Sequence, residues 1–155
     1  MTVEERKKMA AKTKEAVESI FLTLPEKERK MMGFIHGEKE YLTVADSKRL
    51  IARFVYRKGN TPISCFDLMD VGTEDLNAVV ITRYGKSYRG KGYATKCVNQ
   101  GIEWWMKNRG NLKYKHIVWW AESDNKGSQK VAEKCGFIMD AKGSKQYKGW
   151  FRYIF

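Results

Sequence analysis

A basic turn that contains two glycines is the part of this chain best suited to chemistry. It reads RGKGYA over residues 89–94 and follows an apolar-rich segment, residues 76–84. A helical pattern begins at Gly92, and the first backbone N–H groups of a helix have no partner within it and carry partial positive charge. Because glycines let an anion approach such groups closely, the turn predicts a cradle for a pyrophosphate group. A helix start that merely needs small residues explains the same pattern equally well.

The spacing of the two glycines narrows the class of ligand. It fits neither GxGxxG nor GxxxxGK[ST], so folds that bind dinucleotides or nucleoside triphosphates through those motifs are poor matches. A second segment, AESDNKGSQKVAEKCGF at residues 121–137, starts with capping residues and continues as a helix through Lys134. Gly136 ends that helix, and a strand is expected to begin at Phe137.

The remaining elements place these two segments in an α+β protein. We expect two helices over residues 3–20 and 25–32, a weak pattern with an extended piece at 41–45, and a hairpin over 49–71. A strand over 76–84, a helix over 92–108 and a strand at 116–121, buried on both faces, follow before the second segment. The last strand is YKGWFRYIF. The chain is predicted to be one domain, residues 1–155, with an atypical, mainly helical part at 1–47.

The two segments together resemble the GNAT superfamily of acyl-CoA N-acyltransferases. RGKGYA matches the family signature R/Q-x-x-G-x-G/A, and YGKSYRGKGYATK is especially similar to the branch that includes the ribosomal-protein N-terminal acetyltransferases. The second segment is similar to that branch's Asn-x-x-Ser and E-K-x-G-F pattern, with Asn125 and Ser128 in the first part. The likeness covers about residues 48–155. It implies a mixed sheet, part antiparallel meander and part parallel crossover, which is splayed at its centre.

The resemblance also implies acetyl-CoA as co-substrate and a set of residues that bind it. In the family, one strand pairs its backbone with the pantetheine arm, and the glycine loop holds the pyrophosphate. A bulge-type distortion of the strand over 76–84 would splay it from the strand at 116–121. Two polar residues face the same cleft. The corresponding positions here are Ile81, Thr82, Arg83 and Tyr84; Arg89, Gly90, Lys91, Gly92, Tyr93, Ala94 and Thr95; and Asn125 and Ser128.

Catalysis in the family is direct attack of an amine on the thioester, which needs a base for the amine and a donor for the departing thiolate. Many members supply the donor with a tyrosine that here is replaced by Ala132. Ser128, one turn earlier, is the substitute we predict. Glu122, at the end of the strand at 116–121, is the first candidate for the base, and Asp75 or Glu74 comes second.

The charge distribution indicates which kinds of partner the chain attracts. The 155 residues carry a net charge of +12, and residues 81–155 hold 16 Lys/Arg against 5 Asp/Glu, whereas residues 61–80 hold four acidic residues and no basic one. The second half therefore attracts anions. A basic nucleic-acid-binding or ribosome-associated module on the same fold, without activity, is the alternative to an enzyme. Paired tryptophans at 104–105 and 119–120 are expected in the core or on half-buried surface rather than stacked on bases.

The sequence lacks the patterns that are typical of metal-binding, secreted and membrane-spanning proteins. Three dispersed cysteines and two histidines form no spacing that suits a metal, so no metal site is predicted and the cysteines are expected to be reduced. The N-terminus has no apolar signal-peptide core, and the longest apolar run is far shorter than the ~20 residues that cross a bilayer. We therefore expect a cytoplasmic N-acetyltransferase with no membrane partner, whose acceptor is a small-molecule amine or a protein N-terminus.

Overall fold

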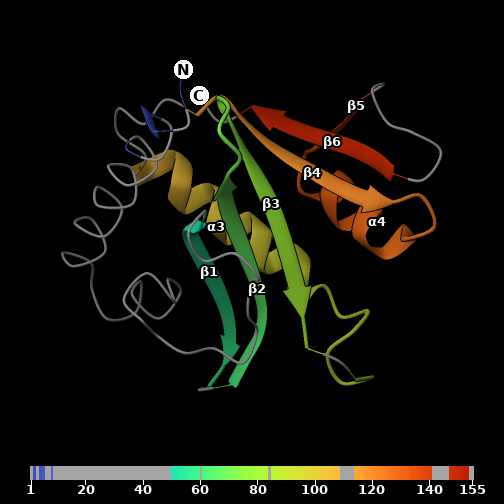
Figure 1. The fold of residues 1–155 in the computed structure, drawn as a ribbon. Coiled ribbons are helices and arrows are strands. Elements are labelled where there is room, and N and C mark those ends of the chain that lie inside the picture. The colour runs from blue at the N-terminus through green and yellow to red at the C-terminus, as the bar shows by residue number, and fades with distance from the viewer. Residues whose placement is uncertain are drawn as a thin grey trace.

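The computed structural model describes residues 2, 4, 5, 8, 50–59, 61–83, 85–108, 114–140 and 147–153, and from Leu50 onward these contain six strands and two helices. The six strands form one sheet in the order β1-β2-β3-β4-β6-β5 (Figure 1). In chain order the elements are β1 (Leu50–Lys58), β2 (Thr61–Asp70), β3 (Asp75–Thr82), α3 (Tyr93–Asn108), β4 (His116–Glu122), α4 (Lys126–Lys134), β5 (Ile138–Asp140) and β6 (Tyr147–Tyr153).

The sheet consists of two antiparallel halves joined by one parallel pair. β1, β2 and β3 form a meander, and β6 pairs antiparallel with both β4 and β5. β3 and β4 are the parallel pair, connected through α3. This confirms the predicted α+β class with both meander and crossover parts.

Both helices pack on the same face of the sheet and close one core. α3 contacts β1, β2 and β3, while α4 contacts β4 and β5 (Figure 1). The core cluster joins residues of both sheet halves and both helices, including Phe54, Leu76, Trp105, Ala132 and Trp150. Neither helix in the described part of the chain is long and apolar enough to cross a membrane.

The helix boundaries follow the local signals in the sequence. The Gly92 carbonyl accepts the N–H of Lys96 at 3.1 Å as α3 begins. Asn125 caps α4, because its side-chain oxygen accepts the N–H of Ser128 at 3.1 Å. Gly136 ends α4 with φ 82°, a conformation that suits glycine. The predicted helices over 92–108 and through Lys134 are therefore confirmed.

The prediction that the strand at 116–121 is buried on both faces is wrong. Along β4, Ile117, Trp119 and Ala121 are buried against the helices, but Trp120 is 49% exposed. The continuous apolar run concealed an ordinary alternation, since Trp120 belongs to the face opposite α3 and α4. Trp104, Trp105 and Trp119 lie in the core, as expected for these tryptophans.

The predicted bulge in the third strand is also wrong. β3 keeps one unbroken register with β2, from Ser64 opposite Thr82 to Asp70 opposite Leu76. β4 likewise keeps one unbroken register with β6 along its whole length. The shifts in register lie between β1 and β2 instead. The sheet therefore opens between two intact halves rather than at a local distortion of one strand.

Of the predicted N-terminal helices, the structure describes only a few residues. Glu4, Glu5 and Lys8 are helical, and Thr2 and Glu5 exchange the two hydrogen bonds of a capping box. The rest of the predicted helices over 3–20 and 25–32, the piece at 41–45, and Tyr84 lie outside the described part.

Candidate functional site

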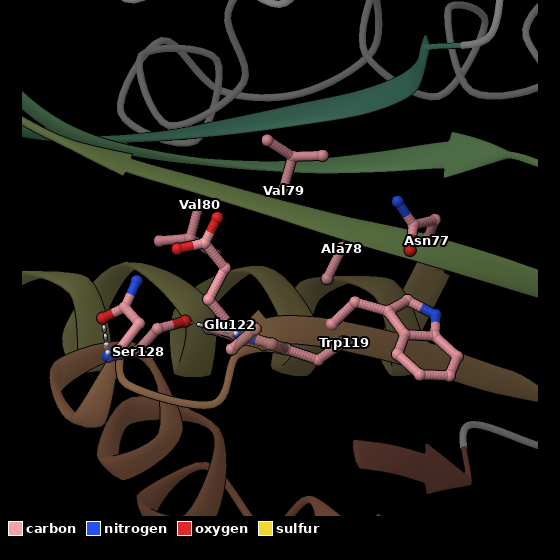
Figure 2. Close-up of a pocket in the computed structure, with 10 residues that line it drawn as sticks. Asn77, Ala78, Val79, Val80, Trp119, Glu122 and Ser128 are labelled. Carbon is pink, nitrogen blue, oxygen red and sulfur yellow. Dashed lines mark hydrogen bonds between the residues drawn. The ribbon is translucent and has the colours of Figure 1, made fainter. Parts of the chain in front are cut away.

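A cleft opens in the middle of the sheet, where β3 and β4 separate. The two strands are paired only at their beginnings, where Asp75, Leu76 and Asn77 lie opposite residues 116–118. Beyond that point lies a cleft of about 490 Å³ (Figure 2). Its lining residues come from β3, β4 and the start of α4: Asn77, Ala78, Val79, Val80, Trp119, Trp120, Ala121, Glu122, Asn125 and Ser128.

The lining residues divide between the two faces of the sheet. Side chains alternate along a strand, and Figure 2 shows Ala78 and Val79 on opposite sides of β3. Ala78 and Trp119 belong to the core on the helix side. Asn77, Val79, Trp120 and Glu122 follow the alternation to the other side. A gap between strands can therefore be reached from both faces.

The open edge of β3 presents the backbone groups of alternate residues. The N–H of Arg83 donates to the carbonyl of Ile63 at 2.8 Å, and the Ile81 carbonyl accepts from the Ser64 hydroxyl at 3.0 Å, so both point toward β2. Because successive residues of a strand point their backbone groups in opposite directions, those of Val80 and Thr82 face the cleft side. Within the predicted segment, Thr82 thus presents its backbone to the gap, whereas Ile81 and Arg83 do not.

Ser128 lies half-buried on the helix side of the cleft, and its hydroxyl is held by Trp119. The indole Nε1–H of Trp119 donates to Ser128 Oγ at 2.9 Å (Figure 2). A hydroxyl has one donor and two acceptor positions, so this bond leaves the Ser128 proton for another acceptor. Asn125 uses its side-chain oxygen to cap α4 while it also lines the cleft. The sequence pointed to Ser128 and Asn125 but held no signal for the contact with Trp119.

Glu122 is the carboxylate in the cleft. Its side chain is exposed and extends from β4 toward β3 (Figure 2). Gln129, which is buried, donates its amide N–H groups to the carbonyls of Glu122 and Ser123, both at 3.1 Å, and so holds the turn between β4 and α4. Sequence reasoning missed Gln129, because a glutamine inside a helix carries no local sign of burial.

The other two candidates for the base are not brought to the cleft. Asp75 pairs with His116, Nδ1 to Oδ1, at 2.7 Å, at the end where β3 and β4 are still joined. Glu74 forms an exposed ion pair with Lys115 at 3.2 Å. Neither carboxylate lines the cleft, so Glu122 is the candidate that the geometry retains.

The glycine turn lies between the end of β3 and the start of α3 and is open to solvent. Gly90 and Gly92 have φ of 71° and 77°, and a Cβ built on either would meet no atom within 4 Å. Arg89 and Lys91 are exposed, and the Arg89 guanidinium donates to the Thr82 carbonyl at 3.2 Å. Arg89 therefore connects the turn to the open edge of β3.

The residues that follow the turn face the core to different degrees. The Tyr93 ring is buried, stacks on Tyr56 at 5.6 Å between ring centroids and lies under the Lys58 ammonium, so only its backbone is left for a ligand. Ala94 and Thr95 are half-buried. The first turn of α3 contains no acidic side chain, so nothing there offsets the positive end of the helix.

The cysteines are unsuited to carry an acyl group. All three are free and buried, and burial raises the pKa of Cys65 to about 12 and of Cys135 to about 11. Burial also raises the pKa of Cys97. A protonated thiol is a weak nucleophile, which fits direct transfer better than an acyl-cysteine. No group of three or more candidate metal ligands occurs among the described residues.

This geometry, a sheet that opens beside a basic helix start, coincides with a family match. A family model described as an acetyltransferase (GNAT) domain matches residues 11–138. The chain belongs to the GNAT acetyltransferase family. The match begins well before residue 48, where the likeness read from the motifs starts.

The individual relatives of this GNAT chain match it over only part of its length or at low sequence identity. An uncharacterized N-acetyltransferase of Bacillus subtilis, YjdG, is 35% identical over 82 residues, which are 52% of this chain and 46% of that protein. The match thus spans less than half the length of the curated relative.

Solved structures show the same fold. The ribosomal-protein-S5-alanine acetyltransferase of Vibrio fischeri has a TM-score of 0.54 at 20% identity and covers 66% of this chain and 61% of its own. A GNAT acetyltransferase of Streptococcus pneumoniae has a TM-score of 0.55 at 12% identity, with 72% and 70% covered. The spermidine N-acetyltransferase of Vibrio cholerae in complex with CoA and spermine has a TM-score of 0.52 at 18% identity, with 66% and 65% covered.

Proposed function

We propose that the chain transfers an acetyl group from acetyl-CoA to a primary amine, on a small molecule or a protein N-terminus, by direct attack in a ternary complex. The observation that carries this proposal is the opening of the sheet between β3 and β4 next to the basic start of α3. The first feature offers strand backbone that pairs with no neighbouring strand to an amide-containing arm, and the second offers N–H groups and cations for phosphates.

The turn would hold the pyrophosphate. Gly90 and Gly92 leave space around the backbone, Arg89 and Lys91 supply positive charge, and the absence of acidic residues in the first turn of α3 leaves the helix start positive. The residues proposed for this part are Arg89, Gly90, Lys91, Gly92, Tyr93, Ala94 and Thr95, with Tyr93 contributing through its backbone.

The cleft would hold the pantetheine arm and the thioester. We assign the backbone contacts to Thr82, from the predicted segment, and to Val80, because these two residues direct their backbone groups to the gap. Asn125 and Ser128 lie on the opposite wall. Of the described residues in the segment predicted to contact the pantetheine arm, this assignment keeps Thr82, and it adds Val80, which precedes that segment.

Glu122 and Ser128 have separate roles in the transfer, the first as a proton acceptor and the second as a hydrogen-bond donor. Glu122 accepts a proton from the incoming ammonium, the amine nitrogen forms a bond to the thioester carbonyl carbon, and the carbon–sulfur bond breaks. The nitrogen then releases its second proton to water, which leaves a neutral amide and the CoA thiolate. Ser128 donates a hydrogen bond to the departing sulfur with the proton that the Trp119 bond leaves available. A thiol is a much stronger acid than an alcohol or an amine, so the thiolate can leave as its anion and a hydrogen bond from Ser128 suffices without full proton transfer.

Ala132 is the reason why Ser128, rather than residue 132, is proposed as the hydrogen-bond donor to the sulfur. It stands where many family members have tyrosine, and it is fully buried, so a larger side chain at this position would not fit without rearrangement.

The test is a binding experiment followed by turnover. Calorimetry should show one acetyl-CoA per chain, and a panel of amines should then produce free CoA thiol at a rate that depends on the amine. Glu122→Gln keeps size and hydrogen bonding but removes the base, so it should lower kcat/KM by about 100-fold or more and change its pH dependence. Salt-sensitive binding of nucleic acid without acetyl-CoA binding would favour the alternative module instead.

A further inference from the structure

The cleft differs in charge from the rest of the molecule. The chain carries a net charge of +12, and the turn before α3 is basic. Among the ten described residues that line the cleft, Glu122 alone is ionisable. A cation is therefore attracted to the cleft itself, while anions are attracted to the turn.

An exposed aromatic side chain precedes that carboxylate by two residues along β4. Trp120 is 49% exposed and lines the cleft, whereas Trp119 and Trp150 are 4% and 0% exposed. Trp120 and Glu122 are two residues apart on β4, so their side chains leave the same face of the sheet about 6–7 Å apart. That face is opposite α3 and α4, and thus opposite Ser128.

The Trp120 ring lies directly on the backbone of Gly149, its partner across the β4–β6 pair. A Cβ at residue 149 would lie 2.9, 3.0 and 3.2 Å from three carbons of the indole six-membered ring. Only a residue without a Cβ allows this contact unchanged. Gly149 thus supports the ring from below, and the exposed half of Trp120 is available to a ligand.

We propose that Trp120, supported by Gly149, and Glu122 form the acceptor subsite and select a linear primary alkylammonium. The inference rests on the proposed function. The indole face attracts the ammonium charge and the adjoining methylenes, and Glu122 binds the ammonium before it accepts the proton. The acceptor then enters the gap from the face opposite the helices, so that both substrates meet between β3 and β4 without sharing a path.

The test compares ligands and variants in the protein–CoA complex. By calorimetry, n-butylamine should bind and its uncharged counterpart n-butanol should not. Trp120→Leu keeps an apolar side chain but removes the aromatic face, so it should weaken n-butylamine binding, and raise the KM for this amine, by about 2- to 30-fold. Trp120→Phe should retain most of the affinity. The dissociation constant of acetyl-CoA should stay within twofold in both.

Two further variants separate the subsite from general effects. Gly149→Ala should weaken n-butylamine binding in the same direction by displacing the ring, with folding checked by thermal unfolding. Ile138→Ala truncates a side chain that is 58% exposed and lies outside the cleft lining, and it should change neither dissociation constant.

The outcomes distinguish the two proposals. If Trp120→Leu binds n-butylamine as wild type does while acetyl-CoA still binds, the acceptor subsite is overturned and the proposed function stands. Turnover of a peptide N-terminus but not of n-butylamine overturns the selection of a linear alkylammonium. A wild-type chain that does not bind acetyl-CoA overturns the proposed function, and the inference with it.

Discussion

Substituting Gly101 by alanine should destabilise the protein, although alanine is the better helix former. Gly101 lies in the middle of α3, at the point where the helix packs on β1 and β2. A Cβ there would lie 2.6 Å from a ring carbon of Phe66 and 2.8 and 2.9 Å from two of Phe54. Ordinary carbon contacts are about 3.5–4.0 Å, so the added methyl group requires a shift of about 1 Å.

The neighbouring rings have little room to make that shift. Phe54 and Phe66 are fully buried and stack at 5.9 Å between centroids, and Phe54 also packs on Trp104 at 5.6 Å. Overpacking of this kind costs about 1–3 kcal/mol, and with contacts this short we take the upper value. Alanine in place of glycine returns about 1 kcal/mol of helix propensity. The free energy of unfolding should therefore fall by about 2 kcal/mol, which lowers the Tm by roughly 4–8 °C for a chain of this size.

A second helical glycine provides the matched control. A Cβ at Gly127, in the first turn of α4, would meet only Asn125 Oδ1 at 3.8 Å, an ordinary contact. Gly127→Ala should leave stability unchanged or raise it by up to about 1 kcal/mol. Urea unfolding, followed by tryptophan fluorescence, measures both through the midpoint at constant slope. If Gly101→Ala unfolds at or above the wild-type midpoint, the close packing of α3 on the sheet is not as described.

Two further predictions concern the site and a third concerns the buried cysteines. Gly92→Asp and Gly92→Asn have the same shape, and both tolerate a φ of 77°, so the aspartate should bind acetyl-CoA about tenfold or more weakly than the asparagine by calorimetry, and less so at high salt; equal affinity would place the pyrophosphate elsewhere. Ser128→Ala should lower kcat more than it raises the KM for acetyl-CoA, and Trp119→Phe should lower kcat in wild type but not further in the Ser128→Ala background; independent, additive effects would show that the indole does not act through the hydroxyl. Burial raises the thiol pKa values to about 12 for Cys65 and about 11 for Cys135, so at pH 8 these thiols are protonated and a thiol reagent should modify all three cysteines only after denaturation, whereas rapid labelling of the native chain would contradict their burial.

The elements between Leu50 and Tyr153, the fold class and the family could be predicted from the sequence because their signals are local. The turn after Lys58, the cap at Asn125 and the glycine after α4 act on residues within a few positions along the chain. Two motif segments were enough to indicate the GNAT fold, which the family match and the solved structures confirm. The same locality explains the success with α3, whose apolar face repeats at helical spacing.

Which partner each side chain meets, in the core and at the site, was decided by contacts between strands. Arg53 alternates with apolar residues in β1, yet it is fully buried because Asp67, from β2, pairs with it at 2.7 and 2.8 Å. In the same way, Trp119 and Trp120 are adjacent and chemically identical, but strand alternation directs one to Ser128 and the other to Gly149. Hydrophobicity and spacing describe what a side chain prefers. Which partner it meets depends on the register of one strand against another, and that register exists only in the folded chain.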